Sequence, residues 1–342
     1  SSFVYVETAG LAFAGKLVGD ALGLTRPVTE PRTDGFPAEA LPRIAPEIEV
    51  GALGPRATGL SAEARVDLAE GMLRAMSMTK GFARLVMLAG HGSTTVNNPH
   101  ASSYHCGACG GNPGHTNARV GAAILNDPDV RAALRERGIS IPDDTWFIGA
   151  LHDTTTDEVT VYDQAGAPES HQSELEEVRQ WLSQASVLAR AERSEGLGIE
   201  GSDVDAQVIA RSRDWSQVRP EWGLARNAAF IAAPRSRTEA LDLGGRVFLH
   251  DYDWRQDGQW NVLELILTAP VVVASWINLQ YFGSAADPEA FGSGNKVLQN
   301  VVGTLGVLEG NGGDLRVGLP RQAVHNGREL VHEPLRLQVV IE

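Results

Sequence analysis

The sequence predicts an α/β protein in which a mostly parallel sheet is flanked by helices. Short apolar runs at residues 85–89, 146–151 and 228–233 have the length and composition of buried strands. The longer segments between them carry apolar residues at helical spacing. Strands that alternate with helices are typical of a parallel sheet, because each helix returns the chain to the end of the sheet where the strand began.

The first predicted helix follows a connection rich in proline. Residues 26–50 combine proline with scattered acidic residues and are expected to form an extended surface segment. Ser61 is expected to cap the helix, with Glu63 in its first turn, and Gly81 is expected to end it. The expected buried face consists of Val66, Ala69, Met72, Leu73 and Met76.

Three further helices are predicted in the middle of the chain. One covers residues 116–125, and the next is expected to have Asp127 as its N-cap and Pro128 as its first residue. A longer helix is expected from His171 to Arg193. Its expected buried residues are Leu175, Val178, Leu182 and Leu188.

The remaining elements are short strands and one long apolar segment. The strands are expected at residues 159–162, 247–250 and 335–341. Residues 262–279 are mostly apolar and have about the length of a membrane-spanning helix. This segment contains Glu264, Pro270 and Asn278, each costly in hydrocarbon, so we expect a buried or partner-facing segment instead.

Composition limits the domain organisation and the partners. We expect an extended entry segment at 1–50, an α/β core at 51–258 and a carboxyl-terminal segment at 259–342 that packs on the core or on a partner. A net charge of -14 argues against nucleic acid and against attraction to anionic lipid. Two cysteines in 342 residues argue against a secreted protein stapled by disulfides.

Histidine and cysteine gather in one short stretch. Four of nine histidines and both cysteines lie within residues 91–115: His91, His100, His105, His115, Cys106 and Cys109. Imidazole and thiolate are the ligands that zinc prefers. His91 follows a predicted strand, as does His152, and ligands of parallel sheets bind outside the carboxyl ends of the strands. The pattern predicts a metal site centred on His91 and Cys106, with the other three histidines of the stretch at the surface or around the ligands.

Two other functions fit the same residues. Cys106 and Cys109 have the C-x-x-C spacing of a dithiol redox site, although the glycine-rich run 110–114 would postpone the helix that such sites need. A silent scaffold, in which His91 caps a turn and the cysteines are buried, is the third possibility. A catalytic triad with Ser93 as nucleophile is the least favoured interpretation, because Ser93 lacks the flanking G-x-S-x-G pattern of a nucleophile elbow.

Ordered motifs along nearly the whole chain resemble those of the DabA-type family of inorganic carbon transporter subunits. They are His91-Gly92-Ser93, Asn97-Asn98-Pro99-His100, Cys106-Gly107-Ala108-Cys109-Gly110-Gly111, Asn117-Ala118-Arg119, and the runs at 211–215, 219–223, 233–237, 259–261, 277–281 and 310–316. The resemblance implies a core like that of β-class carbonic anhydrases, with Gly-rich carboxyl-terminal additions. It also implies zinc held by two Cys, one His and one Asp, of which His91 and Cys106 are the matching positions here.

The resemblance also implies partners and a location. Members of the family pair with an antiporter-like membrane subunit and are expected as peripheral proteins on the cytoplasmic face of the bacterial inner membrane. Together the two subunits are expected to convert CO2 to bicarbonate in an energy-coupled way.

The sequence departs from the family pattern at the metal site. The family's other two ligands belong to a Cys-x-Asp-x-Arg motif, and Cys106 and Cys109 are the only cysteines here. We expect a second chain to supply this motif, since the chain begins abruptly in an apolar stretch, and hence activity only with that partner. The alternatives are that Cys109 and a local histidine substitute, or that the site is inactive.

Several polar residues are candidates for a role beside the metal. Ser93, Asn97 and Asn98 are expected to orient ligands or substrate. Asp153 would accept a proton or orient His91, or else cap a turn before Thr154. Arg119 would steer bicarbonate or lie solvated on its helix.

Overall fold

The computed structural model describes residues 10–22, 24, 36–37, 39–40, 44–94, 112–214, 224, 226–292, 299–302, 306–309, 315–316, 319, 324–325 and 328–339. Within these residues the strands form three three-stranded sheets, one of them entirely antiparallel, and a two-stranded hairpin.

The first sheet has the order β3-β4-β5. The strands β3 (Leu85–Gly92) and β4 (Trp146–Asp153) run parallel and in register, from Leu85 opposite Trp146 to Gly92 opposite Asp153. The strand β5 (Val159–Val161) pairs antiparallel with β4. All three strands lie where the apolar runs predicted them, and β3 and β4 each continue through the residues that follow the run.

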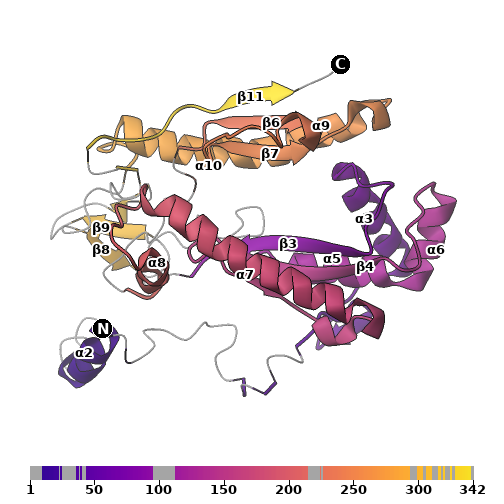
Figure 1. Ribbon diagram of the computed structural model, residues 1–342, viewed down its shortest axis with the longest axis horizontal. Helices are drawn as coiled ribbons and strands as arrows, with labels where there is room; N and C mark the ends of the chain where they lie inside the picture. Colours follow the sequence, from indigo (N-terminus) through magenta and orange to yellow (C-terminus); the bar gives the residue numbers. More distant parts are fainter. Residues whose placement is uncertain are drawn as a thin grey trace.

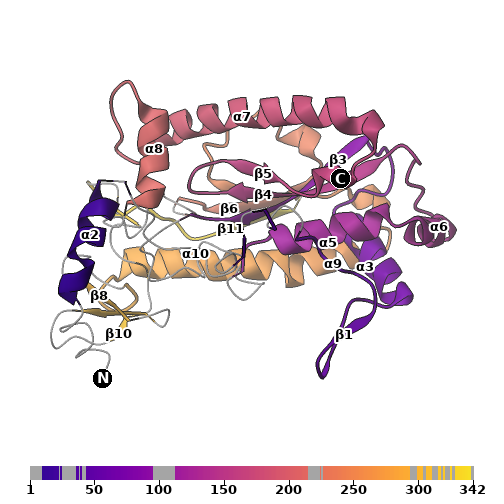
Figure 2. The same cartoon turned by 90° about the horizontal axis from the view of Figure 1, so that it is seen from below.

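Helices cover both faces of this sheet. Figure 2 shows α7 (Gln172–Ser194) on one face and α5 (His115–Asn126) on the other, with α3 (Ala62–Ala75) beside α5. A short helix, α6 (Pro128–Glu136), follows α5. The core on the α5 side includes Val86, Leu88 and Phe147, and the core on the α7 side includes Leu85, Met87 and Ile148. Side chains of a strand alternate between faces, so the odd-numbered residues of β3 and the even-numbered residues of β4 face α7.

The helix ends follow local chemistry, with one correction. The Ser61 hydroxyl accepts a hydrogen bond from the backbone N–H of Ala64 at 3.2 Å, as predicted for an N-cap. Gly81 does not end α3, which stops at Ala75. Ser77 takes a positive φ of 53° there, and the N–H of Met78 bonds to the carbonyl of Leu73 at 2.8 Å. This is the bonding pattern of a Schellman motif with serine in the place usually taken by glycine.

The buried face of α7 differs from the prediction at one position. Leu175 is buried as expected, but Leu188 is 70% exposed. The inward positions near Leu188 are polar: Ser186 and Arg190 are buried. Apolar periodicity therefore gave the wrong face for this part of the helix, because its inward side chains bond to a polar turn.

The second sheet is parallel throughout and has the order β11-β6-β7. Its strands are β6 (Ala229–Ala233), β7 (Val247–Asp251) and β11 (Arg336–Val339), close to the predicted ranges. Figure 1 shows α10 (Pro270–Ala286) lying along this sheet, with α9 (Asn261–Thr268) before it. Their shared core includes Phe230, Tyr252, Ile266 and Ala274. The carboxyl-terminal segment thus packs on β6 and β7.

The long apolar segment forms α9 and α10, which meet at Pro270. One side is buried: the Asn278 amide donates to the carbonyl of Asn227 at 3.0 Å and accepts from the N–H of Leu335 at 2.9 Å. The other side is exposed, with Trp276 at 67% and Leu279 at 63%. By length and composition alone, residues 261–286 could cross a membrane, although one or two such helices are weak grounds for a membrane protein.

The remaining elements are short. They are α2 (Ala14–Ala21), the hairpin β1 (Gly51–Leu53) and β2 (Arg56–Thr58), α8 (Val204–Arg213), the antiparallel strands β8 (Gln299–Val302), β9 (Gly306–Glu309) and β10 (Leu315–Arg316), and 3-10 turns at Gly10–Phe13, Gln164–Gly166, Glu169–His171, Arg235–Arg237 and Trp254–Gln256.

A close approach of two glycines should make β3 sensitive to a single methyl group. A Cβ at Gly90 would lie 2.3 Å from the carbonyl carbon of Gly114. We therefore expect Gly90→Ala to lower the free energy of unfolding by about 1–3 kcal/mol, as overpacking does. Urea unfolding followed by circular dichroism would measure the change.

Gly71 provides the matched control. It lies inside α3 with nothing within 4 Å of an added Cβ, so Gly71→Ala should raise stability by about 0.5–1 kcal/mol. Equal stabilities for the two variants would contradict the close approach of β3 and α5.

The stability of the second sheet should depend on pH through His332. Burial lowers the pKa of His332 to about 4, from an ordinary value of 6.5, and its Nδ1 accepts from the N–H of Arg226 at 3.0 Å. The unfolded chain takes up this proton at a higher pH than the folded chain, so stability should fall as pH drops from about 6.5 to about 4. Thermal unfolding across this range should show a weaker decline for His332→Gln; an identical decline would exclude His332 as the cause.

Candidate metal centre

His91 lies at the carboxyl end of β3, where α5 begins. The N–H of Gly114, the residue before α5, donates to the carbonyl of His91 at 2.7 Å. The absence of a side chain at Gly90 and Gly114 permits this contact. The N-terminus of α5 therefore lies next to the backbone of His91, and the dipole of a helix favours negative charge near its N-terminus.

His152 lies directly beside His91 in the sheet. The two residues are register partners in β3 and β4, and neighbouring strands are about 4.8 Å apart. Both belong to the set of strand residues that faces α7. The sheet thus places two imidazoles at one edge and on one face.

A tight turn follows β4 and connects it to the end of β3. The Asp153 carboxylate accepts hydrogen bonds from the N–H groups of Thr155 at 2.9 Å and Thr156 at 3.3 Å. It also accepts from the N–H of Thr94 at 3.2 Å and from the Thr94 hydroxyl. The N–H of Thr154 donates to the carbonyl of Gly92 at 2.8 Å. Asp153 therefore caps the turn, the second of its two predicted roles, and a role in proton transfer stays a prediction.

Three side chains of α7 hold the same turn from the other side. Ser186 and Arg190 donate to the carbonyls of Asp157 and Thr156, both at 2.6 Å. Arg193 donates to the carbonyls of Thr154 at 2.7 Å and Thr155 at 2.8 Å. Arg190 is 4% exposed, and its charge is balanced by Asp205 of α8 at 2.7 Å. The spacing of these three residues places them on one helical face.

Asp157 joins this network to His152. Its Oδ1 lies 3.0 Å from Nε2 of His152, and its Oδ2 lies 2.8 Å from Nε of Arg193. The residue is 8% exposed and adopts a positive φ of 56°. A buried carboxylate needs such compensation, and the guanidinium provides it.

The other predicted residues fall into two groups. Asn97, Asn98, His100, His105, Cys106 and Cys109 lie outside the described residues. Ser93 follows β3, and its Oγ is buried without a hydrogen-bond partner among the described residues. His115 starts α5 and stacks on Tyr162, with 5.4 Å between ring centroids. Within the described part of the chain, no three His, Cys, Asp or Glu residues are grouped so that they could hold a metal.

Arg119 is neither solvated nor free to steer an anion. Its side chain is 11% exposed and lies 2.6 Å from the Asp163 carboxylate. It also lies over the Tyr162 ring, 5.0 Å from the centroid. The solvated arrangement predicted for Arg119 is thus wrong, because α5 packs closely enough on β4 to bury it.

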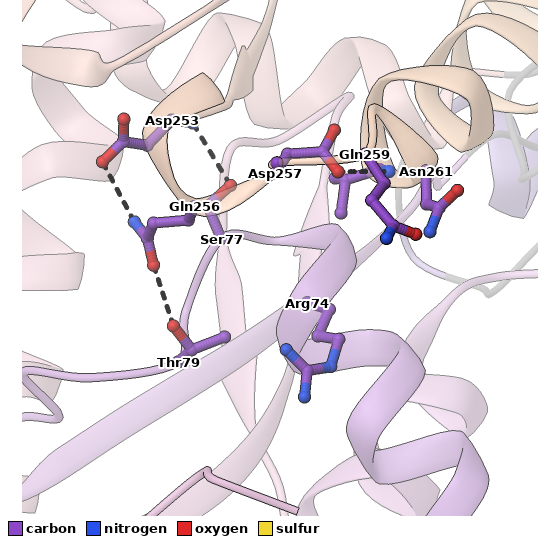
Figure 3. Close-up of a pocket in the computed structure, with 10 residues that line it drawn as sticks. Arg74, Ser77, Thr79, Asp253, Gln256, Asp257, Gln259 and Asn261 are labelled. Carbon is purple, nitrogen blue, oxygen red and sulfur yellow. Dashed lines mark hydrogen bonds between the residues drawn. The ribbon is translucent and has the colours of Figure 1, made fainter.

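A polar pocket of about 280 Å³ lies elsewhere, between the end of α3 and the start of α9 (Figure 3). Polar groups of its lining bond to one another: Thr79 donates to Gln256 at 2.8 Å, and Asp257 accepts from the N–H of Val262 at 3.1 Å. Burial and a hydrogen bond to Asp257 raise the pKa of Tyr252 to about 12. These contacts cap α9 and join the segment after α3 to the second sheet.

Fold and site together define an α/β protein with a histidine-bearing strand edge beside a helix N-terminus. A family model described as "Probable inorganic carbon transporter subunit DabA" matches residues 1–342. The chain belongs to this DabA family.

The relatives carry the same description. The chain is 64% identical to probable inorganic carbon transporter subunit DabA 2 of Bradyrhizobium sp. (strain BTAi1), over all of this chain and 41% of that protein. It is 60% identical to the corresponding subunits of Roseiflexus castenholzii and Chloroflexus aurantiacus, again over all of this chain and 41% of each relative. The chain thus spans about two-fifths of the length of these relatives. No solved structure matches it.

The contacts of α7 predict a large difference between two arginines of that helix. Arg190→Met would leave the buried carbonyl of Thr156 without its donor and Asp205 without its partner, so stability should fall by about 1–3 kcal/mol. Arg179→Met is the control, because Arg179 is exposed and pairs with Glu176 within one turn, and should change stability by about 0.5 kcal/mol or less. Amide hydrogen exchange at residues 154–158 should accelerate only in the first variant; unchanged protection there would contradict the role of Arg190.

Proposed function

We propose that this chain contributes half of a zinc site in an inorganic carbon transporter subunit, and that the completed site converts CO2 to bicarbonate. The observation that carries the proposal is the position of His91 at a strand end beside the N-terminus of α5. Cys106, fifteen residues further along the sequence, is the second proposed ligand.

The chemistry of these donors fits zinc. A neutral imidazole and a thiolate are both ligands that zinc binds in tetrahedral sites. The α5 N-terminus favours the thiolate form of a cysteine held near it. When bound, zinc lowers the pKa of a water from 15.7 to about 7, which provides hydroxide for CO2 at neutral pH.

The described residues of the chain hold His91 in place. Asp153 ties the segment at Thr94 to the turn after β4, and Thr154 bonds to the carbonyl of Gly92. A ligand fixed by its surroundings loses less freedom when it binds metal, so these bonds favour a preformed half-site. Ser93 and Asn98 are proposed to orient ligands or substrate beside it.

We propose that the two further ligands come from outside these 342 residues. A Cys-x-Asp-x-Arg motif in a second chain, or in additional sequence such as the longer relatives have, would complete the set. We propose that the completed subunit acts on CO2 and bicarbonate only in this assembled form.

The proposed partner is an antiporter-like membrane subunit, with this chain at the cytoplasmic face of the bacterial inner membrane. The outer side of α9 and α10 supports a contact with an apolar surface, since Leu265, Trp276 and Leu279 are exposed there. The description of the relatives as transporter subunits also supports an assembly.

Metal content is the first test of the proposal. Elemental mass spectrometry on the chain alone, and on the chain co-purified with its partners, should find about one zinc per chain in the co-purified sample. His91→Ala and Cys106→Ala should each abolish it, whereas Cys109→Ser should retain it. CO2 hydration should follow the zinc content across the variants.

Other outcomes separate the alternative functions. Activity that is lost in Cys109→Ser, with no zinc in any sample, would identify a dithiol redox protein. No zinc and no activity in any sample would leave a scaffold, and either result would refute the proposed site.

A further inference from the structure

The hydrogen bonds around His152 define which of its ring nitrogens carries a proton. Nε2 lies 3.0 Å from Oδ1 of Asp157. Asp157 is buried and is ion-paired with Arg193, so it acts as an acceptor only. A neutral His152 must therefore carry its proton on Nε2, which donates to Asp157. Nδ1 is then a lone-pair acceptor.

The surroundings of Asp157 fix its position on every side. Its own carbonyl accepts from Ser186 at 2.6 Å, and its N–H donates to the carbonyl of Asp153 at 2.7 Å. The carboxylate faces Arg193 of α7 and His152 of β4. The Asp157 carboxylate that binds His152 is therefore itself fixed by its neighbours. Such an arrangement fixes the orientation of the imidazole ring as well as its tautomer.

His152 is nonetheless accessible. Its side chain is 42% exposed, whereas that of Asp157 is 9% exposed. It stands beside His91, on the same face of the sheet. A histidine that only tied the turn to β4 would not need an exposed ring next to the candidate metal ligand.

We infer that His152 is a substrate-contacting residue of the His91 site, where Nδ1 accepts a hydrogen bond from the hydroxyl of water or bicarbonate. This inference rests on the proposed function. The ligand class is a small hydroxyl donor, because a fixed acceptor orients an O–H group and leaves the oxygen lone pairs free. Asp157 and Arg193 are positioning residues that act through His152.

Two substitutions of His152 distinguish the role of Nε2 from that of Nδ1. His152→Gln places an amide donor near the position of Nε2, so it keeps the bond to Asp157 and removes the acceptor at Nδ1. His152→Asn places an amide oxygen near the position of Nδ1 and removes the bond to Asp157. A purely structural histidine would be replaced better by Gln, and a substrate-contacting one better by Asn.

The first measurement needs neither zinc nor activity. Long-range ¹H–¹⁵N NMR of the chain labelled with ¹⁵N-histidine should show the Nε2–H tautomer for His152, with the assignment made by comparison with His152→Gln. Bicarbonate should shift the Nδ1 resonance, and chloride at equal ionic strength should not. Asp157→Asn should weaken the tautomer preference.

The second measurement uses the co-purified complex. Isotope exchange between CO2 and bicarbonate should fall about tenfold in His152→Gln, the effect of losing one hydrogen bond, with zinc content and thermal stability unchanged. His152→Asn should retain more exchange than His152→Gln despite a lower thermal stability.

The outcomes keep this inference separate from the zinc proposal. The inference alone would be overturned by a complex that binds zinc and is active, if His152→Gln exchanged CO2 and bicarbonate at the normal rate and the Nδ1 resonance did not shift with bicarbonate. A bicarbonate-dependent Nδ1 shift in a protein that never binds zinc would support the contact and overturn the zinc proposal.

Discussion

The hydrogen bonds between α7 and the turn after β4 are the constraint on which the site geometry depends. Residues 154–157 direct four consecutive backbone carbonyl groups towards α7, and side chains of Ser186, Arg190 and Arg193 donate hydrogen bonds to all four. Buried carbonyl groups without donors would each cost about 1–3 kcal/mol. The donors include the guanidinium groups of Arg190 and Arg193, which are buried and half-buried. Their charges are balanced by Asp205 and Asp157.

Side chains of the same turn also fix the surroundings of His91 and His152. Asp157 fixes the ring of His152, and Asp153 bonds to Thr94 beyond the end of β3. On the opposite face, the contact between Gly90 and Gly114 brings the start of α5 to His91. The edge that carries His91 and His152 is thus held by α7 on one face and by α5 on the other.

Much of the fold could be predicted from the sequence because its signals are local. Apolar runs located β3 and β4, and Ser61 and Asp127 cap their helices as predicted. The predicted end of α3 at Gly81 was wrong because Ser77 adopts the left-handed conformation that glycine usually takes. The division of the predicted strands between two separate sheets depends on packing between distant segments, such as β11 with β6, and no local pattern contains it.

The site was predictable only in part for the same reason. The cluster of ligand-type residues and the strand ends identified His91 and placed His152 at an equivalent position. Asp157 and Arg193 were not identified, since they are 36 residues apart in sequence and only the packing of α7 brings them together. The exposure of Leu188 has this origin too: the inward face of α7 is polar where it meets the turn.

The central claim is that His91 is a metal ligand in a mixed nitrogen and sulfur site. Zinc K-edge X-ray absorption on the zinc-loaded, co-purified protein measures the ligand shell directly. The account predicts sulfur at about 2.3 Å together with nitrogen or oxygen at about 2.0–2.1 Å, and loss of this shell in His91→Ala. A shell of oxygen and nitrogen only, or one unchanged by that substitution, would contradict it.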